Sequence, residues 1–485
     1  MQKYLLLYMM ILMLGLYSCT EEVSDATALV TEEVLYTSGE NVRLLGRLIT
    51  NQSINVSDHG FYLSEDENFA SPIIVSLGEK DGPGRFIGEA NGLTNSKTYF
   101  AKAFMELGGE TQFGNVIELE TLSPKLGDFT PSFGQVGQEM VIVGQNFTED
   151  TRVFFGENEA NITGIDFESR IHLIIPNPSK MTVPLKVMVQ DTMLEFETSF
   201  EYQIGTYEII SSFPEAVRLY GTAFYSIGNG LNIGLGTISK NSFYSKIQRF
   251  EIGSGTWDEV DFPGSPRAFA FATSNFLGGG TADLTPNPYD INRSFYRVKT
   301  NGFERLPDLN FDSRESIAFE YMGNLYVLGG KEGNPNAVRL YNASSGSWTS
   351  LPDSPIALST EYAFFNYEDK LFVIDDEKKV WEYLIPSNSW NIVSNFPGSL
   401  GQGYGVGEVL GEKAYVGLYN RGTELWEFDL NSFKWKPKND IPGTPSDVTV
   451  AHFSTGGYIY FMRMPDISIA GNYPMNLFKF DPNGF

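Results

Sequence analysis

A repeated pair of aromatic residues constrains the second half of this 485-residue sequence more than any other feature. In each pair the second aromatic follows the first by seven residues, and the second members recur after 46, 45, 42 and 45 residues. The pairs are Phe250/Trp257, Tyr296/Phe303, Tyr341/Trp348, Tyr383/Trp390 and Phe428/Trp435. Helical repeats have periods of about 33–34 residues, whereas units of about 40–50 residues form four-stranded propeller blades. The spacing therefore predicts one antiparallel sheet per unit.

The sixth unit lacks an outer strand of its own. Its third strand is expected at residues 476–480, and the sequence stops at Phe485 before a fourth. Residues 207–210, followed by Ser-Ser-Phe-Pro, resemble residues 257–260, followed by Asp-Phe-Pro. We therefore expect residues 207–210 to complete the last sheet, which would close the ring and leave no free edge. Residues 205–485 are thus predicted to form a six-bladed β-propeller.

A glycine motif adds a family resemblance to this count. Residues 324–330 read Asn-Leu-Tyr-Val-Leu-Gly-Gly, and the preceding unit keeps three glycines at 278–280. This pattern resembles the double-glycine signature of kelch repeats, and it implies a kelch-type, galactose oxidase-like propeller. Copper enzymes of that class need a Tyr–Cys crosslink and two histidine ligands. Copper oxidase activity is excluded, because this region holds no cysteine and one histidine, His452, which is expected to be structural.

Composition supports an all-β chain and argues against one class of partner. The sequence has 37 Phe, 25 Tyr and 49 Gly and shows no long stretch of helical period. Its formal charge of −26 repels phosphate backbones, so no nucleic-acid partner is expected. No metal or other cofactor is predicted.

The N-terminus predicts export and lipidation. Lys3 precedes an apolar run at 4–17 that is too short to span a bilayer, so residues 1–18 are expected to be a signal peptide. The run ends in Leu-Tyr-Ser-Cys at 16–19, which resembles the lipobox of bacterial lipoproteins and implies acylation of Cys19. Residues 19–25 would form the tether, and Glu21-Glu22 resembles the surface-export signal of Bacteroidetes lipoproteins. An outer-membrane lipoprotein exposed at the cell surface is the expected location.

Residues 26–122 predict a first sandwich. Residues 41–49 alternate so that Val42, Leu44 and Leu48 share one face. Leu93 and Tyr99 match a tyrosine corner, in which a buried hydroxyl bonds to nearby backbone. With Gly-Phe-Tyr at 60–62, the segment resembles fibronectin type III-like modules.

Residues 123–204 predict a second sandwich. The matching residues are Pro131, Gly134, Gly137, Val-Ile-Val-Gly-Gln-Asn-Phe at 141–147, Val-Phe-Phe-Gly at 153–156 and Ile-Ile-Pro at 174–176. They resemble an IPT/TIG domain of the immunoglobulin-like fold. In this motif Phe147 is expected to plug the sandwich, while Gly or Asn adopts the positive φ of a sharp turn. Both sandwiches are interpreted as spacers, and a polymer-binding face is the alternative.

Candidate ligand-binding residues come from the segments that enter the first strand of each blade, because such segments usually surround the channel mouth. In blade order they are Arg218, Arg267, Arg314, Glu361, Tyr404 and Asp447. Three arginines on consecutive blades predict a clamp for the carboxylate of an acidic sugar, with Glu361 and Asp447 accepting bonds from sugar hydroxyls. In the alternative, the arginines brace loops through carbonyl groups. No catalytic residue is assigned.

The sequence thus favours a lipid-anchored surface protein whose propeller is a recognition head for a glycan or a protein, beside an outer-membrane importer of the TonB-dependent class. The first alternative is a metal-free carbohydrate-active enzyme, similar to sialic acid mutarotases, and it rests on fold resemblance alone. The second alternative is a protein–protein scaffold.

Overall fold

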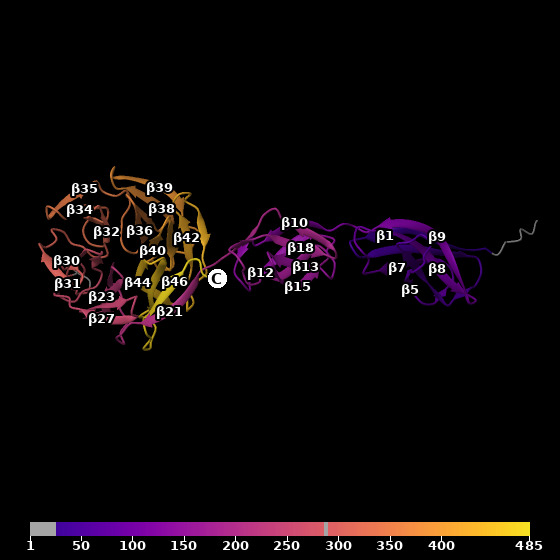
Figure 1. The fold of residues 1–485 in the computed structure, drawn as a ribbon, viewed down its shortest axis with the longest axis horizontal. Coiled ribbons are helices and arrows are strands. Elements are labelled where there is room, and N and C mark those ends of the chain that lie inside the picture. Colours follow the sequence, from indigo (N-terminus) through magenta and orange to yellow (C-terminus); the bar gives the residue numbers. More distant parts are fainter. Residues whose placement is uncertain (1–25, 286–289) are drawn as a thin grey trace, which may run out of the picture. The chain divides into compact units, whose positions relative to one another are not determined.

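The computed structural model describes residues 26–285 and 290–485, and every regular element among them is a β-strand (Figure 1). The predicted signal peptide, Cys19 and the tether lie outside the described residues. The described chain divides into two compact units, the first ending at Tyr202 and the second beginning at Gln203. None of the described segments forms an apolar helix long enough to cross a membrane.

The first sandwich packs a three-stranded sheet on a four-stranded one. The first sheet has the order β1 (Thr27–Thr37), β2 (Val42–Thr50), β7 (Gly84–Ala90), and the second has the order β5 (Ile73–Ser76), β4 (Asp58–Ser64), β8 (Thr98–Leu107), β9 (Glu110–Glu120). The short strands β3 (Asn55–Val56) and β6 (Lys80–Asp81) pair separately. Val42, Leu44 and Leu48 are all buried, and the backbone N–H of Thr94 donates to Tyr99 Oη at 3.0 Å. The predicted buried face and tyrosine corner are both confirmed.

The second sandwich has two four-stranded sheets and a three-stranded ribbon. Their orders are β10 (Lys125–Thr130), β12 (Glu139–Gln145), β16 (Arg170–Ile174), β15 (Asn161–Asp166); β14 (Asn158–Glu159), β13 (Arg152–Phe155), β18 (Leu185–Val189), β19 (Thr192–Glu195); and β11 (Phe133–Gly134), β20 (Phe200–Tyr202), β17 (Thr182–Val183). Asn146 takes the left-handed conformation at φ 59°, and Phe147 is fully buried behind it. The turn predicted from the sequence motif is therefore present.

Residues from 206 onward form six four-stranded sheets arranged around a centre, with the first strands inside and the fourth strands outside (Figure 1). Blade 1 consists of β22 (Ala223–Ile227), β23 (Gly230–Gly234), β26 (Ile247–Glu251) and β27 (Thr256–Val260), and blade 2 of β28 (Phe271–Ala272), β29 (Phe276–Gly278), β30 (Phe295–Lys299) and β31 (Gly302–Leu306). Blade 3 consists of β32 (Ile317–Tyr321), β33 (Asn324–Leu328), β34 (Val338–Asn342) and β35 (Ser347–Leu351), and blade 4 of β36 (Ala363–Tyr367), β37 (Lys370–Ile374), β38 (Lys379–Leu384) and β39 (Ser389–Asn395). Blade 5 consists of β40 (Val406–Leu410), β41 (Lys413–Gly417), β42 (Leu425–Asp429) and β43 (Trp435–Pro437). A small hairpin, β24 (Thr237–Ser239) and β25 (Ser242–Phe243), extends from blade 1.

Blade 6 is completed by the strand that begins the domain. Its order is β44 (Asp447–Thr455), β45 (Tyr458–Pro465), β46 (Asn476–Asp481) and β21 (Thr206–Ser212). Tyr207 lies opposite Phe480 in the β21–β46 pair, and their ring centroids are 4.6 Å apart. The predicted closure is confirmed. With it, the predicted class is confirmed as all-β, with two Ig-like sandwiches followed by a six-bladed propeller.

The repeated aromatic pairs mark the hairpin between the third and fourth strands. In blades 1, 3, 4 and 5 the two aromatics lie directly opposite each other, as Tyr341 and Trp348 do with centroids 5.0 Å apart. Blade 2 differs, because its tight turn places Phe303 opposite Val298 and not opposite Tyr296. The seven-residue spacing therefore reflects a four-residue turn in blades 1, 3, 4 and 5 and a diagonal contact between Tyr296 and Phe303 in blade 2.

Candidate functional site

Backbone hydrogen bonds join the segments that enter the first strands of neighbouring blades. They run from Phe269 N to Gly221 O at 2.7 Å, from Glu315 N to Phe269 O at 3.1 Å, from Thr360 N to Glu315 O at 3.0 Å and from Tyr404 N to Glu361 O at 2.7 Å. Thr222 Oγ1 adds a bond to the carbonyl of Val450 in blade 6. We call these segments the girdle. Their backbone bonds connect blades 1 to 5 in succession, and the Thr222 bond connects blade 1 to blade 6, all at one end of the channel.

Several girdle residues adopt the left-handed conformation. The φ angles are 59° at Phe269, 58° at Glu315 and 52° at Tyr404, and Gly221 has 63°. For residues other than glycine this conformation costs on the order of 1–3 kcal/mol each and is retained only where the surroundings fix it. Here the girdle bonds supply that constraint, and the three side chains line the channel.

A cavity of about 120 Å³, the mouth cavity, lies at this end of the channel. Its wall takes at least one residue from every blade: Tyr220, Phe269, Glu315, Thr360, Tyr404 and Thr449. An engineered cavity of about 150 Å³ accommodates benzene, so this volume suits one six-membered ring. The wall mixes aromatic rings with hydroxyl groups and one carboxylate.

The carboxylate of Glu315 is the most constrained polar group in the wall. Its side chain is 4% exposed; Arg314 Nη1 donates to Oε1 at 2.6 Å and Tyr404 Oη donates to Oε2 at 2.8 Å. Burial raises the pKa of Glu315 above the usual 4.5, and the bonds from Tyr404 and Arg314 only partly oppose it. Burial and the Glu315 charge also raise the pKa of Tyr404. The pair therefore joins a buried acid to a phenol that donates to it.

A second polar pair adjoins the first. The Tyr220 ring lies edge-on to Tyr404 with centroids 5.6 Å apart, and Asn420 Nδ2 donates to Tyr220 Oη at 3.2 Å. Burial raises the pKa of Tyr220 to about 12. Asn420 is 4% exposed, and its Oδ1 has no hydrogen-bond partner within residues 26–285 and 290–485. Asn420 is not among the residues that line the mouth cavity, so its amide supports the Tyr220 hydroxyl from outside the cavity.

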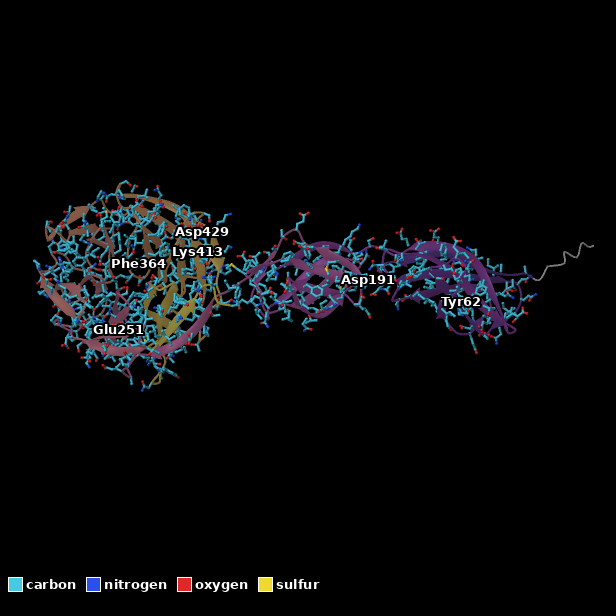
Figure 2. The ribbon with its side chains drawn as sticks, in the orientation of Figure 1. Tyr62, Asp191, Glu251, Phe364, Lys413 and Asp429 are labelled. Carbon is cyan, nitrogen blue, oxygen red and sulfur yellow. The ribbon has the colours of Figure 1, made fainter. Side chains whose placement is uncertain are left out.

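The mouth cavity shares five lining residues with a second cavity in the channel, and we call these five residues the waist. The shared lining residues are Phe224, Ala272, Ala318, Phe364 and His452. Phe364 is labelled within the propeller in Figure 2. His452 Nδ1 lies 2.6 Å from Glu408 Oε1, so the histidine expected to be structural stands in the channel wall beside a carboxylate.

The opposite end of the channel holds a larger cavity, the vestibule, of about 510 Å³. Its polar lining includes Ser226, Ser274, Glu320, Asn366 and Ser454. Glu320 accepts hydrogen bonds from Asn275, at 2.9 Å from its N–H and at 2.7 Å from Nδ2.

The structure does not bring the three predicted arginines together as a clamp. Arg267 has an exposed fraction of 0%, and it donates to the carbonyls of Ser265 at 3.0 Å and Gly279 at 3.2 Å. Arg218 Nη1 donates to the carbonyl of Asp466 at 2.9 Å. Both arginines therefore brace loops through carbonyl groups, which was the alternative expected from the sequence. The predicted carboxylate clamp is wrong for Arg267, because its buried guanidinium is out of reach of a ligand.

The remaining predicted residues divide between the wall and its surroundings. Arg314 bonds Glu315 and also Glu332, at 3.1 Å, and Glu361 pairs with Lys331. Tyr404 is the one predicted residue that lines the mouth cavity. Asp447 lies outside both channel cavities and accepts a bond from Thr444 Oγ1 at 3.0 Å.

Sequence reasoning missed the other wall residues by one or two positions. Glu315 follows Arg314, Phe269 lies two residues after Arg267, and Tyr220 lies two residues after Arg218. The left-handed backbone of the girdle turns these neighbouring side chains toward the channel. Phe and Glu are not residue types that favour a positive φ, so the sequence does not predict this conformation at Phe269 or Glu315. Among the described residues, no group of three or more histidine, cysteine or acidic side chains is placed to hold a metal ion.

Comparison with known proteins assigns one domain. The IPT/TIG domain model matches residues 124–202, so this sandwich is an IPT/TIG domain. The solved structure of YjhT is 14% identical, with a TM-score of 0.44 over 56% of this chain and 96% of that one. A structural genomics protein of unknown function from Bacteroides thetaiotaomicron VPI-5482 is 14% identical, with a TM-score of 0.39 over 74% of this chain and 98% of that one. Likenesses this distant say nothing of function, and no curated protein matches the sequence.

Proposed function

We propose that the propeller is a recognition head that binds the terminal ring of a neutral carbohydrate in the mouth cavity. The observation that carries this proposal is the wall itself, in which all six blades contribute side chains around a volume that suits one ring. Aromatic rings such as Phe269 and Tyr220 suit the apolar face of a sugar, while the hydroxyl groups of the wall suit its edge. Mostly apolar pockets with a few fixed polar groups are typical ligand sites.

The buried polar groups support a hydroxylated ligand over an apolar one. Glu315 lines the mouth cavity and retains lone pairs beyond those used by Arg314 and Tyr404. A ligand hydroxyl near this carboxylate would gain a hydrogen bond in a site of low dielectric, where such bonds are strong.

Charge revises the ligand class expected from the sequence. Glu315 is an acid in the wall, and no lysine or arginine is among the described lining residues. The background of the whole chain is −26. An anion in the mouth cavity would therefore meet repulsion, so we replace the acidic sugar by a neutral one.

Residues 1–25 support a location for this head. The lipobox-like Leu-Tyr-Ser-Cys motif supports acylation of Cys19, with the membrane as the partner of the lipid. The acidic pair that follows supports export to the outer surface, where the two sandwiches act as spacers and the propeller meets a glycan or a surface protein beside an importer. A Cys19→Ala chain that still takes up an alkynyl fatty acid would contradict the anchor.

The binding proposal is tested with the full chain on a panel of neutral and acidic glycans, followed by calorimetry on the best ligand. We expect neutral sugars to bind and acidic ones to be excluded. Thr360→Val removes a hydroxyl group from the wall of the mouth cavity and should weaken binding by roughly tenfold, since one hydrogen bond is worth about 1 kcal/mol or more. The matched control is Asn366→Ala in the vestibule, which should leave the affinity unchanged. A preference for acidic glycans, or equal effects of both variants, would refute the proposal.

A metal-free carbohydrate enzyme is the second candidate, and one observation favours it. The mouth cavity holds Glu315, whose pKa is raised, and its floor holds His452 with Glu408. Interconversion of sugar anomers needs a proton donor and an acceptor at opposite sides of the ring, and these groups belong to blades 3, 5 and 6. Anomer exchange of free sugars by NMR tests this, and the enzyme hypothesis requires a rate above the spontaneous one that Glu315→Gln abolishes.

A further inference from the structure

A separate cavity of about 610 Å³ lies in blade 6, outside the channel. Its lining residues come from β21, β44, β45 and β46, from the loop before β44 and from the loop between β45 and β46, and none of them lines the mouth cavity or the vestibule. The wall is largely apolar and includes Tyr207, Ile209, Met464, Tyr473 and Phe478. We call it the blade 6 cavity. A space of this size accommodates a ligand larger than one ring.

A buried guanidinium lines this cavity. Arg463 is 2% exposed and makes three hydrogen bonds, to Thr449 Oγ1 at 2.9 Å and to the carbonyls of Gly422 at 3.0 Å and Asp447 at 3.4 Å. All three acceptors are uncharged oxygens. Burial lowers the pKa of Arg463 to about 10, and the nearby Asp447 charge opposes the shift. A buried cation that bonds only neutral oxygens is incompletely compensated, so a carboxylate would stabilise it.

A carboxylate lines the same cavity. Asp447 accepts from Thr444 Oγ1 at 3.0 Å and from Thr444 N–H at 3.4 Å, so no cation is among its bonded partners in the described part of the chain. The cavity therefore offers one positive and one negative side chain beside an apolar wall. A simple acid would face Asp447, and a simple amine would face Arg463. A ligand with both charges close together satisfies both groups.

We propose that the blade 6 cavity binds a free α-amino acid with an apolar side chain. The α-carboxylate pairs with Arg463, the α-ammonium pairs with Asp447, and the side chain packs against the wall at Ile209 and Phe478. Charge-assisted bonds to a guanidinium and a carboxylate fix the backbone of the amino acid, and the apolar wall selects its side chain. This site is independent of carbohydrate binding at the mouth.

The test uses L-phenylalanine as probe, with 3-phenylpropionate and phenethylamine as analogues that lack one charge each. Binding to the full chain is measured by calorimetry. We expect phenylalanine to bind and each analogue to lose roughly ten- to a hundredfold in affinity, because each forfeits a charge-assisted contact. Absence of phenylalanine binding, or equal affinity for either analogue, would overturn the proposal.

Substitutions at an exposed wall position avoid unfolding the blade. Ile209 is 55% exposed, so Ile209→Gln and Ile209→Glu should both fold. The Glu variant places a charge against the apolar side chain of the ligand and should bind phenylalanine at least about tenfold more weakly than the Gln variant, which is polar but uncharged. Equal binding by the two variants would contradict the site, and so would an effect of either on glycan binding at the mouth.

Discussion

The two ends of the propeller channel use the same six inner strands but hold their polar groups differently. At the mouth, bonds between blades fix the girdle, and Glu315 is buried between Arg314 and Tyr404. At the vestibule most inner strands turn directly into the second strand; Tyr321 and Asn324, for example, face each other across a two-residue turn. Such turns depend on local sequence, because residues of positive φ suffice to form them. The comparison indicates that the hydrogen bonds between blades are concentrated at the mouth, together with the buried polar groups that could bind a ligand.

The largest expected difference between the two ends comes from removing their carboxylates. Glu315→Ala leaves Arg314 without one carboxylate and Tyr404 Oη without its acceptor, so we expect a loss of about 3–5 kcal/mol in the free energy of unfolding. Glu320→Ala in the vestibule removes only bonds to Asn275 and should cost about 1 kcal/mol or less. Denaturant unfolding measures both. Similar losses would show that the mouth is not specially constrained.

A smaller difference is expected from two tyrosine hydroxyls. Tyr404→Phe removes a bond to a charged acceptor and should cost about 1.5–3 kcal/mol. Tyr225 lines the vestibule and is 4% exposed, and its Oη has no partner in the described part of the chain. Tyr225→Phe should therefore be neutral or slightly stabilising. Thermal unfolding of the two variants makes the comparison, and a larger loss at Tyr225 would reverse it.

The smallest effect is a pH dependence confined to the mouth. The folded pKa of Glu315 lies above its usual 4.5, so the folded state binds a proton more tightly than the unfolded state does. The stability gained from this proton is complete below pH 4.5 and is lost as the pH rises through the raised value. The native protein should thus lose stability relative to Glu315→Gln over this rise. A difference that is constant with pH would contradict the assignment.

The fold could be predicted because its signals are periodic. Aromatic pairs at a 42–46-residue spacing count the blades, and the likeness of residues 207–210 to 257–260 places the closing strand. The aromatic pairs lie in hairpins, whose partners are close in the sequence, whereas the closing strand is recognised only because its residues repeat those of an outer strand. Blade 2 shows where the pattern fails, because its two-residue turn changes the register of Phe303.

The site could be predicted only in part. The blade repeat identifies the segments that line the mouth, and Tyr404 is the predicted residue that lines the mouth cavity, while ligand binding by it stays a prediction. The clamp fails at Arg267, because its guanidinium is buried against carbonyls, as the loop-bracing alternative expected. The left-handed backbone at Phe269 and Glu315 depends on bonds to neighbouring blades. Such bonds leave no local pattern in the sequence.

Blocking each end of the channel tests the central claim most directly. Thr360 lines the mouth and lies in the segment that enters the inner strand β36, and Asn366 lines the vestibule near the other end of that strand. We would screen native protein, Thr360→Trp and Asn366→Trp against one panel of neutral and acidic glycans, after confirming that all three have similar melting temperatures. The account predicts that native protein and Asn366→Trp bind the same neutral glycan and that Thr360→Trp does not. Retained binding by Thr360→Trp, or its loss only in Asn366→Trp, would contradict it.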